Sequence, residues 1–596
     1  MANPILAEAE YGRRVERFQR EAERLQVLSD RLSDARLVVF LAGIGVLFGG
    51  FQGWWAYAWL TVPLFGFLTL VFVHERATRR LKLAQDGVAL YQRGLARIRG
   101  DWAGGEYAVW SGCPEGHLYA RDIDLFGIGG LFDLLCQART SMGAQTLADW
   151  LLRAAEPQEI AARQAAVQEL APNLDLREDF ALLAGAVRTE VEPDDLQAWA
   201  AEQTMLALPW VQRGTMALAS IGLLAIIAAL VVQNLAPVML VLPLSLLWLG
   251  YTRRAFQSIN TGLSPIVREL RVLSELLQRI ETETFQSPRL VDMRASLSTH
   301  GVSAGQAVER LRRWAEWTDL QNNQLFFPFT LLFAWPALMG VMVERWRAAH
   351  GSALRQHWLR ALGDIEALAS LAALAYEHPD YAWPEVAEGA PRFEATDLAH
   401  ALIPEAHCVR NSLVLNAETP VLIVSGSNMS GKSTLLRAIG LSIALAQAGA
   451  PVPAKRLVLT PLALGAVIRV EDSVRKGASM FYAEIERFRA LLELTEGDRP
   501  LLFLSDEILH GTNTHDRVEG AKALIRGLIE RRALGLATTH DLALTAFAEE
   551  LAGRARNVHF QDRLVGGKLA FDYTLRDGVV QKSNALELMR SIGLPV

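Results

Sequence analysis

Two long apolar runs stand out in the pattern of hydrophobic and polar positions along the chain. They extend from Leu37 to Val73 and from Met216 to Tyr251, and polar residues break each run near its middle. Each run predicts a helical hairpin that crosses a membrane twice, because a spanning helix needs ~17–25 residues and tolerates few ionised side chains. The four predicted spans are Leu37–Gly53, Trp54–Val73, Met216–Val232 and Leu235–Tyr251.

Basic residues flank both runs, whereas the short turns inside them carry no charge. Basic residues next to a span favour the cytoplasmic side of the membrane. We therefore expect a multi-pass protein of the inner (cytoplasmic) membrane, with both ends of each hairpin in the cytoplasm. The alternative is that the runs are buried helices of a large soluble core. The flanking residues are Arg31, Arg36, Arg76, Arg79, Arg80 and Lys82 for the first run, and Arg213, Arg253 and Arg254 for the second.

A fifth apolar run, Leu325–Val343, also has the length of a span. One more crossing would place the C-terminal part of the chain on the opposite side of the membrane from the hairpin ends. The run contains Pro328 and Pro336, which interrupt helical hydrogen bonding. We expect a buried or re-entrant segment that packs against the other helices.

Helical periodicity marks the regions between and after the two hairpins. Asp122–Val191, Ile266–Ile280 and Ala307–Trp317 have apolar residues at three- and four-residue spacing, which predicts helices that pack through apolar stripes. The expected division is an N-terminal helix (1–36), hairpin (37–73), helical core (74–213), second hairpin (214–251), helical lever region (252–394) and α/β domain (395–596).

Composition favours a membrane component and gives no basic footprint for nucleic acid. Of the 596 residues, 51% are hydrophobic and 21% are charged, and the net charge is −6. The cysteines, Cys113, Cys136 and Cys408, match no metal-ligand spacing and are expected to be reduced thiols. The polar first residues predict no cleavable secretory signal. Asp122 and Asp124 form an Asp-x-Asp pair to which the sequence assigns no chemistry.

A short β-branched run, Val421–Val424, is followed by a glycine-rich loop and then a helical pattern. This order of strand, loop and helix is typical of a P-loop, in which backbone N–H groups and a helix N-terminus bind phosphate. Lys432 is expected to reach the β- and γ-phosphates of ATP, and Ser433 is expected to offer its hydroxyl to Mg²⁺. The predicted nucleotide-binding residues of this segment are Gly426, Ser427, Asn428, Met429, Ser430, Gly431, Lys432, Ser433 and Thr434.

Two further strand-like runs end in polar residues suited to ATP hydrolysis. Leu501–Leu504 leads to Asp506, which can hold the water shell of Mg²⁺, and to Glu507, which can polarise the attacking water. Leu534–Thr538 leads to His540, for which a γ-phosphate sensor is preferred over a neighbour of a helix cap. The predicted catalytic residues are Glu507, His540 and Lys432, and the predicted metal-binding residues are Ser433 and Asp506.

Several segments resemble the ATPase domain of MutS proteins. Residues 427–434, Ser-Asn-Met-Ser-Gly-Lys-Ser-Thr, are similar to the N-M-[GAS]-G-K-S-T phosphate loop, and residues 506–513 resemble the D-E-[IL]-G-R-G-T-[ST] segment. Weaker resemblance at Leu131–Gln164 and Glu366–Pro384 implies a MutS-like helical core and lever. Further matches to the domain are Val452-Pro453-Ala454, the signature region from Arg469 to Phe481, Lys582-Ser583 and Gly593-Leu594-Pro595.

The resemblance implies an α/β P-loop NTPase domain of the ABC/MutS type, preceded by a mainly α-helical core with two transmembrane helical hairpins. It implies ATP and Mg²⁺ as cofactors, and a homodimer in which Ser479 of one subunit lies near the γ-phosphate bound by Lys432 of the other. Ordinary helix capping is the alternative role for Ser479. The family binds DNA, so duplex DNA is a possible partner.

The chain also departs from the MutS pattern at positions that concern mismatch recognition. No G-x-F-[YF]-E motif occurs before residue 200, and the second hairpin falls about where a DNA clamp would be inserted. His510 stands where the family has Arg. The leading hypothesis is a membrane-anchored MutS-family ATPase that couples hydrolysis to DNA binding. The alternatives are an ATP-driven membrane scaffold or transporter-like switch that does not bind DNA, and mismatch repair with recognition supplied by another subunit.

Overall fold

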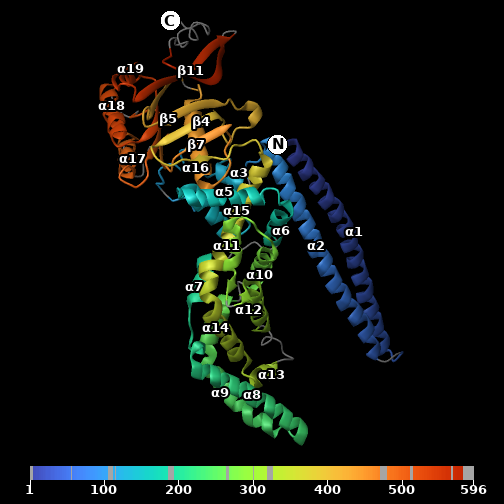
Figure 1. Ribbon diagram of the computed structural model, residues 1–596. Coiled ribbons are helices and arrows are strands. Elements are labelled where there is room, and N and C mark those ends of the chain that lie inside the picture. Colours follow the sequence, from blue (N-terminus) through green and yellow to red (C-terminus); the bar gives the residue numbers. More distant parts are fainter. Residues whose placement is uncertain are drawn as a thin grey trace.

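The computed structural model describes residues 4–54, 57–104, 110, 112–114, 116–185, 193–263, 267–299, 301–318, 327–427, 429–469, 480–509, 514–565 and 568–580. The molecule is elongated (Figure 1). An α/β part lies at one end, a helical middle descends from it, and two helical hairpins extend away from the α/β part.

The α/β part contains two sheets. The larger has the strand order β12-β11-β6-β10-β9-β8, in which β12 is antiparallel to β11 and the other neighbours are parallel. The smaller has the order β3-β7-β4-β5. The bounds are β3 Glu385–Val386, β4 Arg392–Leu398, β5 Asn411–Asn416, β6 Val421–Ser425, β7 Arg456–Leu459, β8 Ala463–Val467, β9 Leu501–Ser505, β10 Leu534–Thr539, β11 Ala555–Val565 and β12 Lys568–Asp577.

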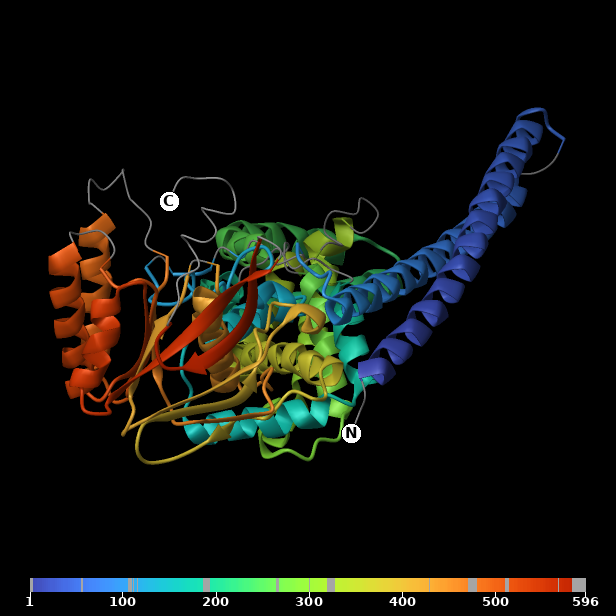
Figure 2. The ribbon, with the colours of Figure 1, turned by 90° about the horizontal axis from the view of Figure 1, so that it is seen from above.

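Helices cover both faces of the larger sheet. Side chains of β6 alternate between two cores: Leu422 and Val424 join the core under α16, while Val421 and Ile423 join the core under α17 to α19. A strand buried on both faces needs a continuous apolar run, which explains why the sequence predicted β6, β9 and β10 correctly. Figure 2 shows the layer of α17, α18 and α19 on the side of the sheet away from the hairpins. These helices are α16 Lys432–Ala448, α17 Met480–Leu494, α18 Thr514–Glu530 and α19 Leu542–Glu550.

The helical middle is organised around α15, Leu359–Glu377, which packs on α4 and α5. A π-helical turn, Leu354–Trp358, joins it to α14. The other elements are α3 Leu131–Leu135, α4 Ser141–Leu152, α5 Pro157–Leu170, α6 Leu174–Gly185, α7 Pro193–Ala201, α10 Val267–Thr282, α11 Pro288–Ser296, α12 Ala304–Thr318 and α14 Trp335–Ala353, with the short hairpin β1 Ser298–Thr299 and β2 Val302–Ser303.

The first hairpin consists of α1, Pro4–Phe51, and α2, Thr61–Arg99, joined through a 3₁₀ turn at Tyr57–Leu60. Aromatic side chains of α1 pack on glycines of α2. A Cβ at Gly87 would lie 2.8 Å from the Phe18 ring, and one at Gly94 would lie 2.7 Å from the Tyr11 ring. These two glycines therefore set how closely the helices approach each other.

The second hairpin consists of α8, Pro209–Val232, and α9, Ala236–Leu263. The fifth apolar run forms α13, Phe327–Leu332, and the first half of α14. Leu332, Ala334 and Ala337 share a core with residues of α8 and α9, which confirms the predicted packing against other helices. The run is broken between these two helices, and Pro336 lies in the first turn of α14, where a missing N–H is tolerated.

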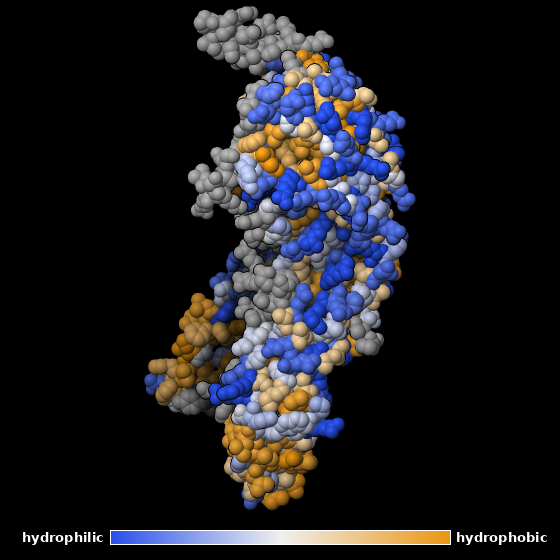
Figure 3. All heavy atoms as spheres, turned by 90° about the vertical axis from the view of Figure 1, so that its left-hand side faces the viewer, coloured by the Kyte–Doolittle hydropathy of each residue, from blue (hydrophilic) through white to orange (hydrophobic). Residues whose placement is uncertain are grey.

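Four helices are long and apolar enough to cross a membrane: Ile5–Phe51, Ala58–Arg99, Pro209–Val232 and Ala236–Leu263. Their apolar side chains gather at the lower end of the molecule, away from the α/β part (Figure 3). The expected boundaries at residues 36, 73, 213 and 251 are not helix ends, and α2 begins at Thr61 instead of Trp54. The helices continue into polar sequence because Ala, Leu, Arg, Gln and Glu all favour helix.

Candidate functional site

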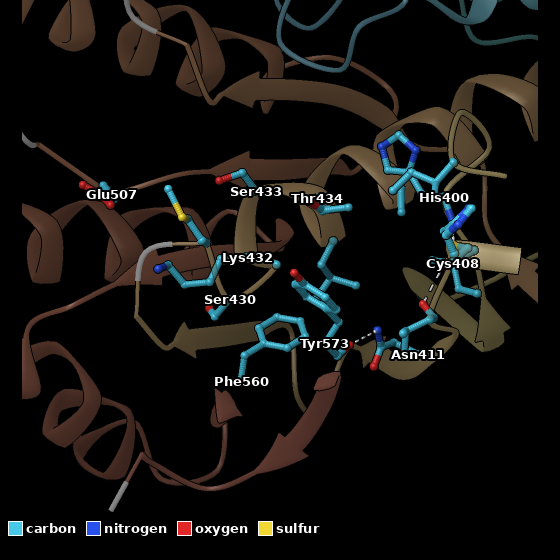
Figure 4. Close-up of a pocket in the computed structure, with 18 residues that line it drawn as sticks. His400, Cys408, Asn411, Ser430, Lys432, Ser433, Thr434, Glu507, Phe560 and Tyr573 are labelled. Atoms are coloured by element: carbon cyan, nitrogen blue, oxygen red, sulfur yellow. Dashed lines mark hydrogen bonds between the residues drawn. The ribbon is translucent and has the colours of Figure 1, made fainter. Parts of the chain in front are cut away.

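The glycine-rich loop connects the C-terminal end of β6 to the N-terminus of α16 (Figure 4). Gly431 precedes the helix with φ of +106°, and a Cβ there would lie 3.2 Å from Tyr573 Cδ1. Glycine therefore satisfies both the backbone conformation and the close approach. The residues that begin α16 line a cavity, which is the arrangement of an anion-binding helix N-terminus.

Lys432 is the first residue of α16 and is buried. Its Nζ donates hydrogen bonds to the carbonyl oxygens of Gly426, at 2.8 Å, and Ser427, at 3.0 Å. Burial lowers the pKa of the Lys432 ammonium, and the nearby carboxylates of Asp506 and Glu507 oppose that shift. The backbone of the loop thus holds the ammonium beside the cavity, where a point charge suits phosphate binding.

Ser433 and Asp506 come together although 73 residues separate them. The Ser433 hydroxyl donates to Asp506 Oδ2, and Thr538 Oγ1 donates to Asp506 Oδ1 at 2.5 Å. Thr538 Oγ1 also accepts from the backbone N–H of Glu507 at 2.9 Å, so it orients both acidic residues. The contacts form because β6, β10 and β9 are neighbouring parallel strands whose carboxyl ends share one edge of the sheet.

Glu507 and His540 form a second contact at this edge. His540 Nε2 lies 2.5 Å from Glu507 Oε1, and Nδ1 lies 3.1 Å from the carbonyl oxygen of Gly426. The histidine therefore links the end of β10 to the acid at the end of β9 and to the glycine-rich loop.

The backbone of Glu507 is in the left-handed region, with φ of +52°. Residues other than glycine adopt this conformation only when their surroundings impose it, and such positions cluster at functional sites. Buried Glu484, on α17, accepts a hydrogen bond of 2.6 Å from the N–H of Leu509 and so fixes the turn that carries Glu507. The sequence did not predict this supporting role for Glu484.

A cavity of about 600 Å³ lies beside the loop, within the range of small-molecule sites. The sequence predicted one wall of it, formed by the loop and the start of α16. The other walls come from the segment between β4 and β5 and from β11 and β12. Their lining residues are Leu398, His400, Ile403, His407, Cys408, Val409, Asn411, Phe560 and Tyr573.

Asn411 ties two of these walls together. Its side-chain amide donates to the carbonyl oxygen of Tyr573 at 3.0 Å, and its Oδ1 accepts from the N–H of Leu575 at 2.7 Å. Tyr573 has φ of +54°, at the irregularity in the pairing of β11 with β12. The bulge turns the tyrosine toward Gly431 (Figure 4).

His400 lies on the wall opposite the loop and is buried. Burial is the main cause that lowers the pKa of its imidazole to about 4, assisted by the Arg437 guanidinium and opposed by Asp124. The backbone N–H of Leu402 donates to His400 Nδ1 at 3.2 Å, and the backbone N–H of His400 donates to Cys408 Sγ at 3.2 Å. This wall therefore presents a neutral ring at physiological pH.

The residues present fit phosphate and Mg²⁺. Within the described part of the chain, the buried hydroxyl oxygens of Ser427 and Ser430 make no hydrogen bond to protein. Buried hydroxyls normally have partners, and phosphate oxygens would supply them. The Ser433 hydroxyl and the Asp506 carboxylate are oxygen donors of the kind that Mg²⁺ uses together with phosphate and water.

The structure brings most of the predicted site residues to one edge of the larger sheet. Asn428 and Ser479 lie outside the described residues, as do His510–Asn513 and the predicted motifs near the C-terminus. The roles of the assembled residues in binding and hydrolysis stay predictions. The assembled residues are Gly426, Ser427, Met429, Ser430, Gly431, Lys432, Ser433, Thr434, Asp506, Glu507 and His540.

Comparison with known proteins gives a consistent result for this part of the chain. Residues 422–596 match MutS domain V. The chain is 34% identical over 238 residues to the "Endonuclease MutS2" of Thermus thermophilus, covering 40% of this chain and 30% of that protein. It is 33% identical over 243 residues to the "DNA mismatch repair protein MutS" of Natronomonas pharaonis, covering 40% and 28%.

A "DNA mismatch repair protein MutS" of Thermus thermophilus is 35% identical over 242 residues, which cover 40% of this chain and 28% of that protein. The chain thus matches less than a third of the length of these relatives. The match to MutS domain V lies within the α/β part, from β6 onward. Residues 422–596 are therefore similar to MutS domain V, and the chain is related to MutS proteins through this part.

Proposed function

We propose that this chain is a Mg²⁺-dependent ATPase with a P-loop of the ABC/MutS type, anchored at the cytoplasmic face of a membrane by its two hairpins. One observation carries the proposal. Lys432, Ser433 and Glu507 line one cavity at the carboxyl edge of the sheet, where Asp506 contacts Ser433 and His540 contacts Glu507. This is the set that ATP hydrolysis needs: a phosphate clamp, a metal-binding pair and a group that can polarise water.

Each side chain has a distinct role in the proposed reaction. Lys432 and the N-terminus of α16 bind the β- and γ-phosphates, and Tyr573 and His400 lie on the walls that would enclose the rest of the nucleotide. Glu507 orients and polarises the attacking water, and His540 senses the γ-phosphate while holding Glu507 in place. Ser433 and Asp506 would hold Mg²⁺, which neutralises charge on the transferred phosphoryl group.

Membrane anchoring is supported by where apolar side chains are exposed. In the hairpin tips, Leu230, Val231 and Leu240 are each more than half exposed, as are Phe51 and Phe65. Such contiguous apolar surface marks a site for membrane or protein contact. The paired spans with basic flanks favour lipid, with the α/β part on the cytoplasmic side where ATP is present.

The proposed assembly is a homodimer, in line with the MutS-related domain. Each ATP would be shared between the P-loop of one subunit and Ser479 of the other. Duplex DNA is the second candidate partner, favoured by the names of the relatives. The exposed apolar surface of hairpin 2, where MutS proteins would carry a DNA clamp, favours instead a partner in the membrane.

The ATPase proposal is tested with detergent-purified protein. Lys432→Ala is expected to lower the hydrolysis rate by about 10²-fold or more, and Glu507→Gln by about 10²–10⁴-fold. Lys455→Ala is the matched control, because Lys455 is exposed and lies outside the cavity. A normal rate for Glu507→Gln would overturn its role, and a normal rate for Lys432→Ala would overturn the site.

The membrane proposal is tested by cysteine accessibility in intact cells. Gln52→Cys and Gln233→Cys place thiols in the two hairpin turns, and Lys82→Cys places one in the polar half of α2. An impermeant thiol reagent is expected to label the turns and to leave Lys82→Cys unlabelled until the membrane is opened. Labelling of neither turn before lysis would contradict spanning hairpins.

The partner is tested by measuring hydrolysis with and without duplex DNA at low and moderate salt. Stimulation that fades as salt rises would indicate phosphate contacts. A rate indifferent to DNA would favour a membrane or protein partner, and preference for a mismatched duplex would indicate repair.

A further inference from the structure

Residues 399–409, which follow β4 and which we call the wall segment, form the side of the cavity opposite the glycine-rich loop. Figure 4 shows His400 and Cys408 of this segment across the cavity from Lys432. Since the phosphates are expected at Lys432, the wall segment is expected to enclose the nucleoside end of a bound nucleotide. The lining residues of the segment are His400, Ile403, His407, Cys408 and Val409.

The wall segment has little buried surface of its own. Ala399 and His400 are buried, whereas none of residues 401–409, each of which the structure describes, is buried. The segment is shaped by local hydrogen bonds, such as the one that the N–H of His400 donates to Cys408 Sγ at 3.2 Å. A segment with few buried contacts is displaced at little cost. Its position therefore depends on what lies behind it.

A second, smaller cavity of about 100 Å³ lies behind the wall segment. His400, Ile403 and Cys408 line both cavities, so the segment is a thin partition between them. The far side of the smaller cavity includes Arg97 and Gly100, at the C-terminal end of α2. The end of the first hairpin (hairpin 1) away from its turn, which we call its base, thus lies directly behind the wall segment.

Gly100 contacts the wall segment directly. It caps the C-terminus of α2 with φ of +82°, and a Cβ there would lie 2.7 Å from Pro404 Cγ and 3.1 Å from Pro404 Cβ. Glycine lets the end of α2 approach the proline ring more closely than another residue would allow. Pro404 begins a 3₁₀ turn, Glu405–His407, and its carbonyl oxygen accepts from the N–H of His407 at 2.9 Å. Displacing the proline would displace this turn, which carries His407 to the cavity.

The end of α2 is itself held firmly. Arg97, one turn before Gly100, makes a buried ion pair with Glu377 of α15, with Nε 2.9 Å from Oε2. Tyr11 of α1 donates its hydroxyl to the same carboxylate. Breaking a buried ion pair by removing one partner is strongly unfavourable, so this end of the hairpin is a rigid support. A tilt of hairpin 1 would therefore be carried to Pro404.

We propose that the base of hairpin 1 positions the wall segment through the contact between Gly100 and Pro404, and that this contact raises the affinity of the cavity for ATP. Both are positioning residues, since neither lines the cavity. The inference rests on the proposed ATP site. A change in the tilt of the hairpin would alter the nucleoside end of the site through this contact and leave the phosphate end at Lys432 in place.

The first test is Gly100→Ala, with Gly104→Ala as its matched control. Both glycines have positive φ, +82° and +89°, so alanine strains the backbone at either position, but a Cβ at Gly104 meets nothing within 4 Å. Relative to the control, Gly100→Ala is expected to weaken ATP binding and raise KM about 5–20-fold. The kcat is expected to stay within about twofold, because Lys432 and Glu507 are not displaced.

The measurements are hydrolysis at graded ATP concentrations and calorimetric titration with ATP, both on the detergent-purified full chain. An unchanged KM in Gly100→Ala would overturn the inference. An equal rise in Gly104→Ala, or a kcat that falls in parallel with the affinity, would overturn it as well.

A second substitution shows whether the loss passes through the proline. Pro404→Ala removes the Cγ nearest to the added methyl group and leaves the Cβ, so it should relieve part of the clash. The double variant Gly100→Ala, Pro404→Ala is expected to bind ATP about threefold or more tightly than Gly100→Ala, with Pro404→Ala alone closing the cycle. A double variant no tighter than Gly100→Ala would overturn the proposed contact.

ATP should in turn stabilise the base of hairpin 1, because coupling between two equilibria is reciprocal. Glu507→Gln is the background for this test, since it is expected to bind ATP without rapid turnover. Hydrogen exchange over residues 88–102 is expected to slow about fivefold or more when ATP and Mg²⁺ are added, and adding Gly100→Ala should remove most of this slowing. Equal exchange with and without bound ATP would overturn the coupling. A wild-type protein that neither binds nor hydrolyses ATP would instead refute the proposed function.

Discussion

The two hairpins join the rest of the molecule in opposite ways. Among the residues that the structure describes, hairpin 1 contacts the helical middle near its base, the end away from its turn, and its most apolar stretches are 6% and 0% buried. Hairpin 2 continues into the helical middle and packs on α13 and α14, and its corresponding stretches are 22% and 17% buried. Hairpin 1 is thus attached at its base, whereas hairpin 2 forms the far end of the helical middle.

The chemistry of the two attachments differs as much as their geometry. At the base of hairpin 1, Arg97 makes a buried ion pair with Glu377, the last residue of α15, and the Tyr11 hydroxyl donates to the same carboxylate at 3.2 Å. Hairpin 2 is held by apolar contacts and by single hydrogen bonds, such as buried Ser245 Oγ to the carbonyl oxygen of Leu332 at 3.0 Å and exposed Arg345 Nε to Gln212 Oε1 at 3.1 Å. A buried ion pair fixes the orientation of the two helices that it joins, whereas apolar packing allows packed helices to slide slightly past each other.

Breaking the ion pair at the base of hairpin 1 should have the largest effect. Arg97→Ala leaves the Glu377 carboxylate buried without its cation and is expected to lower the free energy of unfolding by about 3–5 kcal/mol. Thermal unfolding measures this loss of stability, and limited proteolysis of the polar halves of α1 and α2 reports whether the base of the hairpin opens. The Arg97→Met, Glu377→Met pair should restore much of the loss, and an effect as large as that of Arg97→Ala would contradict the explanation.

A pH series should act on α15, which carries Glu377 at its C-terminal end. Burial raises the pKa of Glu366 to about 7, although Thr140 and the N–H of Arg139 donate to its carboxylate. Because folding raises this pKa, the contribution of Glu366 to the free energy of unfolding is complete below its pKa in the unfolded chain, near 4.5. The contribution is lost as the pH rises through 7, by up to about 3 kcal/mol.

Glu366→Gln is expected to flatten the dependence of stability on pH between about 5 and 8. Glu388→Gln, at an exposed position, serves as the control and should leave the profile unchanged. Chemical denaturation at several pH values provides the measurement. A profile that stays equally steep in Glu366→Gln would assign the dependence to other groups.

The packing of hairpin 2 on α13 should be sensitive to one methyl group. A Cβ at Gly222 would lie 2.9 Å from the backbone carbonyl oxygen of Leu332, whereas a Cβ at Gly250 meets nothing within 4 Å. Gly222→Ala is therefore expected to be about 1–3 kcal/mol less stable than Gly250→Ala in lipid nanodiscs. Equal stability of the two variants would show that α13 does not pack closely on the hairpin at Gly222.

The smallest effect is expected at the surface of hairpin 1. Arg99 and Glu8 also pair across α1 and α2, at 2.8 Å, but both side chains are more than 40% exposed. Arg99→Ala should change stability by about 0.2–1 kcal/mol at most, and added salt should remove the difference. A loss comparable to that of Arg97→Ala would mean that burial does not separate the two contacts.

The sequence predicted the parts whose pattern is local. Strands β6, β9 and β10 were recognised because each is a short apolar run, and the loop before α16 because its glycines and Lys432 lie in one short stretch of sequence. The apolar halves of both hairpins were recognised for the same reason. The polar halves of α1 and α2 were assigned to other domains, since polarity changes at residues 36 and 73 while the helical backbone continues.

Contacts between distant segments could not be predicted in the same way. Tyr573 enters the cavity through a bulge in β12, and Asn411 binds it from a strand 162 residues earlier. Asp122 looked like an ordinary loop acid, but it is buried and accepts hydrogen bonds from the N–H groups of Ile468 and Arg469, which are 346 and 347 residues away. Such roles depend on which strands become neighbours, and the order β6-β10-β9-β8 is not written in any one stretch of sequence.

The length of α1 has a consequence for encounters between molecules. Its 48 residues form a rod of roughly 70 Å, of which the apolar part is less than half. If both hairpins insert into one bilayer, each chain is tethered at two points, so it can neither tumble nor turn over. Two such chains would meet by lateral diffusion, already upright and at matching height. Free proteins lose translational and rotational entropy when they associate, at a cost of roughly 4–15 kcal/mol. Membrane insertion would already have removed much of the rotational part before the two chains meet.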